Sequence, residues 1–89
     1  MARRNRMDII FDMLLAIQSK GDRIKPTHLM YDANLNHKQL QKYVDELEEK
    51  GFVSVQHEDD SRMYVLERKG HLYINKIREM RQFEDAFDI

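Results

Sequence analysis

The spacing of apolar residues changes along the chain between helical and strand-like periods. Apolar positions recur every three or four residues across 7–18, and Gly21 follows, so we predict a first helix over this range. A second helix should begin near Pro26, because the fixed φ of proline suits a first helical turn. The residues at 34–36 read as a polar turn with Leu35 directed inward.

The next segment predicts an amphipathic helix that begins after this turn and runs to about Lys50. Asn36 can cap the helix, and Gln39 occupies the position of the partner in a capping box. Gly51 suits a left-handed C-terminal turn. The expected buried stripe consists of Leu40, Val44 and Leu47.

Two short runs with strand character follow, at 52–56 and 63–66. The polar residues at 57–62 connect them, which predicts a hairpin. A last helix should run from about Arg68 into the low 80s or beyond. One apolar edge of this helix, Leu72 and Ile74, should pack inward on the core. The other apolar stripe is expected to contact a second copy of the chain, and it comprises Tyr73, Ile77, Met80, Phe83 and Phe87.

This order of elements predicts a mainly α fold with a small β-hairpin, namely a winged helix-turn-helix with an added C-terminal dimerisation helix. The second and third helices would form the helix-turn-helix, and the hairpin would form the wing. A helix presented in this way can enter a DNA major groove. We therefore expect a DNA-binding domain over residues 1–67 and a dimerisation helix over 68–89.

Composition and charge add constraints. The 89 residues suffice for one domain, and the absence of cysteine excludes disulfides and thiolate metal sites. We find no apolar run long enough to span a bilayer, so we expect a cytoplasmic, nucleoid-associated protein. The net charge of −1 conceals an asymmetry, because residues 1–42 carry a net +4 and residues 43–89 a net −5. The positive half contains the start of the candidate recognition helix, which suits contact with phosphates.

Five segments carry a resemblance to a known family, and they lie at 3–14, 32–44, 49–53, 64–66 and 69–70. In these segments the sequence resembles the small archaeal winged-helix DNA-binding proteins, which include the Sulfolobus 10a-type chromatin proteins and archaeal winged helix-turn-helix regulators. The resemblance spans nearly the whole chain, and two departures from it are Glu67, where members usually have a Thr or Ser cap, and the acidic wing tip. It implies double-stranded DNA as partner, no enzymatic activity, and a homodimer formed by an antiparallel coiled coil of the last helices. We expect no cofactor.

The candidate DNA contacts come from several parts of the chain. On the third helix, glutamine can read adenine and lysine can bind guanine acceptors or phosphates, although such a face can also be ordinary solvated surface. The basic residues near the start could reach phosphates or a minor groove, or equally form a solubilising tail. The candidates are Arg3, Arg4, Arg6, Thr27, His28, Asn36, His37, Lys38, Gln41, Lys42 and Arg62.

Alternative functions have less support. Winged helices also serve as protein-interaction adaptors, and the near-neutral charge and acidic wing favour that option. The histidines show no metal-ligand spacing, and no nucleophile motif or glycine-rich phosphate loop is present. For the last helix, the alternative to a dimer is that Phe83 and Phe87 fold back onto the core of the same chain.

Overall fold

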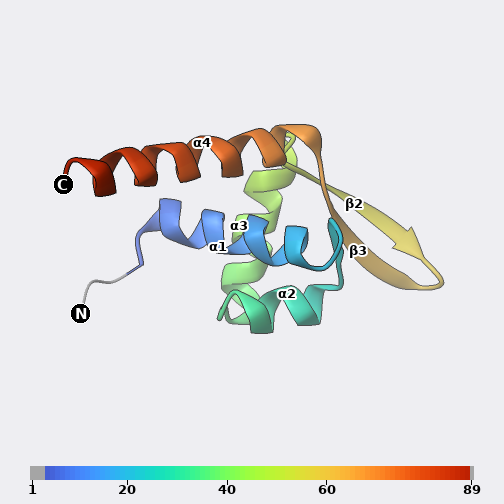
Figure 1. Cartoon of the computed structure of the whole chain (residues 1–89). Coiled ribbons are helices and arrows are strands. Elements are labelled where there is room, and N and C mark those ends of the chain that lie inside the picture. Colours follow the sequence, from blue (N-terminus) through green and yellow to red (C-terminus); the bar gives the residue numbers. More distant parts are fainter. Residues whose placement is uncertain (1–3, 89) are drawn as a thin grey trace.

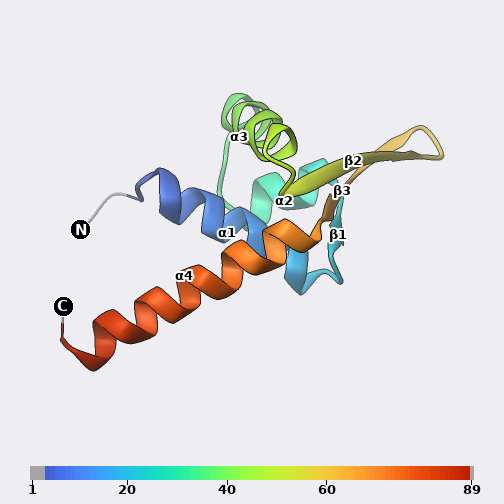
Figure 2. The same ribbon diagram turned by 90° about the horizontal axis from the view of Figure 1, so that it is seen from above.

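The structure, a computed structural model that describes residues 4–88, contains four helices and three strands within that range (Figure 1). Helix α1 and helix α4 run side by side, α3 lies on the other side of α1, and the β2–β3 hairpin projects from the body (Figure 2). The elements are α1 (Arg6–Ser19), β1 (Arg23–Ile24), α2 (Pro26–Asp32), α3 (His37–Glu49), β2 (Val53–Glu58), β3 (Ser61–Leu66) and α4 (Arg68–Ala86). This is the winged helix-turn-helix arrangement that the sequence predicts.

Helix α1 forms the centre of the core. A capping box at Asn5 and Asp8 fixes its first turn. Its inner positions pack against residues from each of the other helices and from the sheet, and the cluster contains no buried charged group among the described residues. The most deeply buried side chains of this core are Met13, Leu14, Ile17, Ile24, Leu29, Leu47, Tyr64 and Ile74.

The segment from α2 to α3 follows the predicted plan. Pro26 is the first residue of α2, and Leu35 in the turn is buried at 7% exposure. Helix α3 buries only the predicted stripe and ends at Glu49. Gly51 then adopts a φ of 79°, a conformation that glycine reaches without the steric cost of a side chain.

The sheet has one strand more than the sequence predicts. The two-residue strand β1 pairs with β3, so the antiparallel strand order is β1-β3-β2. The hairpin is also longer than expected, because its ladder continues to the pair formed by Glu58 and Ser61. Only Asp59 and Asp60 remain as the turn, with φ values of 46° and 64°. Positive φ at both positions is typical of a type I′ turn, which aspartate tolerates better than most residues.

The C-terminal part of α4 extends beyond the rest of the protein (Figure 1). Gly70, Ile74 and Ile77 face the core, and Ile77 is therefore not part of an exposed stripe. The prediction that Leu72 packs inward was wrong, since its side chain is 53% exposed. The reason is rotational, because Leu72 lies two residues from Gly70 and Ile74 and thus on the opposite side of the helix. None of the described helices is long and apolar enough to cross a membrane.

Candidate nucleic-acid interface

The start of α3 is held rigidly by its own side chains. The Asn36 Oδ1 accepts a hydrogen bond from the Gln39 backbone N–H at 2.8 Å, and the Gln39 Oε1 accepts one from the Asn36 N–H at 3.0 Å. This capping box, predicted from sequence, satisfies two backbone donors. The Asn36 side chain therefore caps α3, and its contact with DNA stays a prediction.

The outer face of α3 is polar and open. His37, Lys38, Gln41 and Lys42 are all exposed, as expected for candidate contacts. The Gln41 Nε2 donates to the Asp45 Oδ1 at 2.9 Å, so this amide is already engaged on its own helix. The two lysines have no acidic partner among residues 4–88. These lysines are consequently available to bind an anion.

Four candidate residues from three elements meet around one hollow. It has a volume of about 310 Å³ and lies where α2, α3 and β3 come together. Its floor is apolar, formed by Pro26, Met30, Leu40 and Tyr64, and its polar lining comprises Thr27, His37, Gln41 and Arg62. The remaining candidate on α2, His28, is exposed but does not line this hollow.

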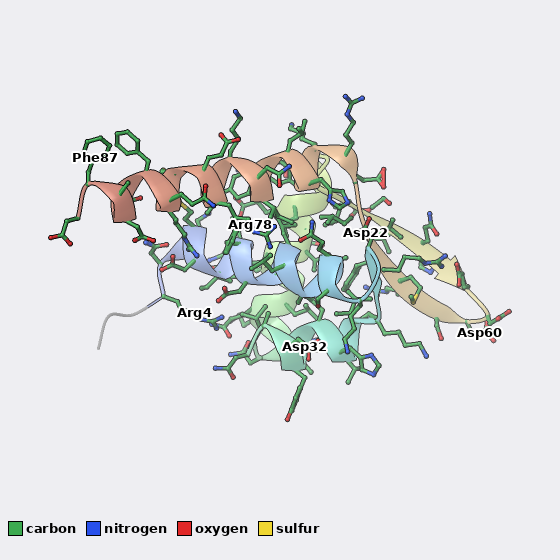
Figure 3. All side chains as sticks on the ribbon, viewed as in Figure 1. Arg4, Asp22, Asp32, Asp60, Arg78 and Phe87 are labelled. Carbon is green, nitrogen blue, oxygen red and sulfur yellow. The ribbon has the colours of Figure 1, made fainter. Side chains whose placement is uncertain are left out.

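The basic residues near the start of the chain contact the protein itself. The Arg4 guanidinium pairs with Asp12 and donates to the carbonyls of Ala33 and Asn34, beside the α2–α3 turn (Figure 3). Arg6 forms an ion pair with Glu46 of α3. Arg4 and Arg6 are therefore bound to groups of the protein itself, and neither belongs to a free solubilising tail or a free DNA-binding arm. The third member of this group, Arg3, lies outside the described residues.

The wing is acidic at its tip, and one of its three acids is paired. Asp60 lies at the tip in Figure 3, and Asp59 precedes it in the turn. Glu58, the last residue of β2 before this turn, forms an ion pair with Arg23 of β1. Arg23 and Lys25 flank the wing, and our sequence reasoning overlooked both because it did not predict β1. Lys25 lines a shallow hollow with Glu58 and Asp59.

The far half of α4 leaves apolar side chains uncovered. Met80, Phe83 and Phe87 are 43%, 59% and 65% exposed, and the two phenylalanine rings stack with centroids 4.8 Å apart. Phe87 lies at the free end of the helix, away from the body (Figure 3). The near half is anchored, since Tyr73 packs against Phe52 with ring centroids 5.1 Å apart. The five residues proposed for a dimer contact thus divide into two buried or half-buried and three exposed ones.

Within residues 4–88, no group of three His, Cys, Asp or Glu side chains is arranged to hold a metal. His71 is instead part of a chain of polar contacts, since its Nε2 lies 2.8 Å from the Asp22 Oδ2 and its Nδ1 lies 3.2 Å from the Gln18 Nε2. These contacts tie α4 to the end of α1 and to the loop before β1.

Comparison with known proteins identifies the family. The model of the winged helix-turn-helix family matches residues 3–85, so this chain belongs to that family. The chain is also 33% identical over 78 residues to an uncharacterized protein of Methanocaldococcus jannaschii. The match covers 88% of this chain and 34% of that relative, so the chain spans about a third of the relative's length.

Two solved structures share the fold across nearly the whole chain. Sso10a-2, a DNA-binding protein from Sulfolobus solfataricus, superposes with a TM-score of 0.82 and 28% identity, covering 94% of this chain and 85% of that one. F93 from STIV, a winged-helix DNA-binding protein, superposes with a TM-score of 0.76 and 16% identity, covering 92% of both chains. The fold is therefore that of winged-helix DNA-binding proteins.

Proposed function

We propose that this protein binds double-stranded DNA by inserting α3 into the major groove, as a transcriptional regulator or a chromatin-associated factor of the nucleoid. The observation that carries the proposal is the outer face of α3, which is polar, exposed and adjacent to the wing (Figure 2). Sso10a-2, which shares the fold, is described as a DNA-binding protein. In this mechanism the protein acts as a binder and catalyses no reaction.

The roles of the side chains follow from their positions. His37 and Gln41 lie on the side of α3 that faces the hollow with Arg62, where they can meet base edges while the arginine binds a phosphate. Lys38 and Lys42 are four residues apart and share the next side of the helix. They supply the positive charge that anchors the duplex.

The test removes these two charges. The variant Lys38→Ala/Lys42→Ala should bind mixed-sequence duplex DNA more weakly, and the slope of log affinity against log salt should fall by about 2, since each phosphate contact contributes about one. A matched control is Lys20→Ala/Arg68→Ala, which removes two exposed charges that lie outside α3 and outside the apolar stripe of α4. Equal binding by wild type and the folded α3 variant would refute the proposal.

We further propose that two copies associate through α4. Its exposed apolar residues are Leu72, Met80, Phe83 and Phe87, and Lys76 lies between the first two. The spacing 72, 76, 80, 83 and 87 places them along one side of the helix, as in a helical seam. An uncovered stripe of this length is uncommon on a monomer. Residues 1–67 would then form the DNA-binding unit, and 68–89 the segment that joins the copies.

An antiparallel arrangement fits both the shape and the charge of the stripe. With the two-fold axis near residues 79 and 80, Leu72 of one copy would lie opposite Phe87 of the other. Lys76 would lie opposite Phe83, where its aliphatic stem can cover the ring. The first half of α4 is basic and its last turn is acidic, with Glu84 and Asp85. Antiparallel pairing therefore brings opposite charges together, whereas parallel pairing would bring like charges together.

Sedimentation tests this association. The variant Met80→Asp/Phe83→Asp should be monomeric at micromolar concentration, because it places charges in an apolar seam, while wild type sediments as a dimer. Both residues are exposed in the single chain, so the fold should survive. Tyr31→Asp is the control, since Tyr31 is 86% exposed on α2. A wild-type protein that sediments as a monomer would rule out the dimer.

A second candidate function is a protein-interaction adaptor. The observation that favours it is the acidic wing tip, where Asp59 and Asp60 would repel a phosphate backbone. Salt dependence separates the two functions. A DNA binder loses affinity steeply as salt rises, whereas an adaptor has little affinity for duplex DNA at any salt concentration.

A further inference from the structure

Arg4 makes three contacts that connect α1 to the helix-turn-helix. Its Nη1 lies 3.1 Å from the Asp12 Oδ2 and donates to the Ala33 carbonyl at 2.7 Å. Its Nη2 donates to the Asn34 carbonyl at 2.9 Å. The planar guanidinium therefore spans a carboxylate of α1 and two successive carbonyls at the end of α2.

These two carbonyls lie at the turn that sets the direction of α3. The last carbonyls of a helix lack partners within the helix, and a cation near them is favourable. Asn34 adopts a positive φ of 55°, the left-handed conformation that often ends a helix and that asparagine tolerates better than most residues. Two backbone hydrogen bonds close this turn, from the Leu35 N–H to the Met30 carbonyl at 2.8 Å and from the Asn34 N–H to the Tyr31 carbonyl at 3.1 Å.

We propose that Arg4, held in place by Asp12, is a positioning residue that fixes the α2–α3 turn and thereby the orientation of the recognition helix, without contacting DNA itself. Arg6 strengthens the same link, because it pairs with Glu46 on α3. The inference rests on the proposed DNA binding by α3. It assigns to Arg4 a role that differs from a phosphate contact, and the two roles predict opposite results in binding experiments.

The first experiment compares Arg4→Ala with Arg4→Lys on mixed-sequence duplex DNA. A positioning role predicts that both variants bind about twofold to thirtyfold more weakly, the range for residues that act on a ligand without contacting it. The salt slope should stay at the wild-type value. A lysine keeps the charge but cannot span two carbonyls and a carboxylate in one plane. Retained affinity in Arg4→Lys, together with a slope lowered by about one in Arg4→Ala, would identify a phosphate contact and overturn the proposal.

The second experiment uses Asp12→Asn, for which the two roles of Arg4 predict changes in DNA affinity of opposite direction. Removing an acid from a DNA-binding protein should leave affinity unchanged or raise it, if charge alone matters. Loss of the positioning contact should lower affinity instead. The matched control is Asp32→Asn, which removes an exposed acid of α2 that has no ion pair within residues 4–88. Tighter binding by both variants would contradict the proposal.

A third measurement needs no DNA and so separates this inference from the proposed function. Hydrogen exchange at the Leu35 and Asn34 amides should speed up in Arg4→Ala, Arg4→Lys and Asp12→Asn, and stay at the wild-type rate in Asp32→Asn. Unchanged exchange in the Arg4 variants would overturn the positioning role. If wild type fails to bind DNA while exchange changes as expected, the proposed function fails but the structural role of Arg4 stands.

Discussion

Helices α3 and α4 pack one apolar side each on the same core, but they differ in what they leave in water. Helix α3 buries all its aliphatic residues, namely Leu40, Val44 and Leu47, and exposes polar groups. Helix α4 buries Ile74 and Ile77 and still exposes Met80, Phe83 and Phe87. Its 19 residues exceed the 13 of α3, and the surplus extends beyond the body (Figure 1).

This difference fits the two kinds of partner proposed above. Exposing a polar helix face to water costs little free energy, so α3 can bind and release a hydrated polyanion such as DNA. Exposed leucine and phenylalanine side chains, in contrast, are stabilised when another apolar surface covers them. Under the proposed function, we therefore expect a reversible, strongly salt-sensitive contact at α3 and a mainly apolar, less salt-sensitive one at α4.

The largest expected effect distinguishes the two sides of α4. Ile74→Ala should lower the free energy of unfolding by about 2–5 kcal/mol, because the side chain is fully buried. Leu72→Ala should cost less than about 0.5 kcal/mol in the single chain. Urea unfolding at several protein concentrations measures both. The Ile74 effect should not change with concentration, whereas a Leu72 effect that grows with concentration would place this residue in the seam between copies.

A smaller effect concerns the cap of α3. Asn36→Ala should destabilise the protein by about 1 kcal/mol, because it removes the acceptor for the Gln39 N–H. It should also weaken DNA binding, since the cap orients the first turn of the recognition helix. Asn36→Asp is the control, because it keeps the acceptor and should retain stability in thermal unfolding. A stability loss of equal size in both variants would show that the cap is not the cause.

The helices and the cap of α3 could be predicted because their signals are local, although the capping box of α1 at Asn5 and Asp8 was not predicted. The periods of α1 and α3, the Asn36 and Gln39 capping box and the turn at Gly51 all involve residues within four positions of each other. Strand β1 could not be found in this way, because its two residues, Arg23 and Ile24, are too few to show a period. Its existence depends on β3, some forty residues later in the chain.

Two further differences between the predicted and the observed structure also arise from contacts between residues that are distant in the sequence. Apolar residues occupy several sides of α4, so spacing alone could not decide whether Leu72 or Ile77 faces the core, and the close approach of Gly70 to the sheet settles it. A Cβ at this glycine would lie 2.6 Å from the Phe52 carbonyl oxygen. The partners of Arg4 are 8 to 30 residues away, so its basic neighbourhood in the sequence suggested a DNA contact instead. The roles of the candidate site residues in binding remain predictions.

The smallest expected effect concerns the N-terminus of α4, which lacks the kind of side-chain cap that α3 has. Helix α4 begins after Glu67, whose side chain makes no capping hydrogen bond to the first turn and instead accepts a weak one from the Ser54 Oγ at 3.3 Å. Glu67→Asp keeps the negative charge that favours a helix N-terminus and shortens the side chain to the length of a good cap. We therefore expect a gain of about 0.5–1 kcal/mol, which would raise the Tm by roughly 2–8 °C for a domain of this size.

Glu67→Ala is the matched variant, and it should change stability by only a few tenths of a kcal/mol, because no cap is lost. It thus contrasts with Asn36→Ala, in which a cap is removed. Thermal unfolding at fixed protein concentration compares the three proteins. If Glu67→Asp gives no gain, the first turn of α4 already has its donors satisfied in solution, and the difference between the two helix starts is one of geometry without an energetic consequence.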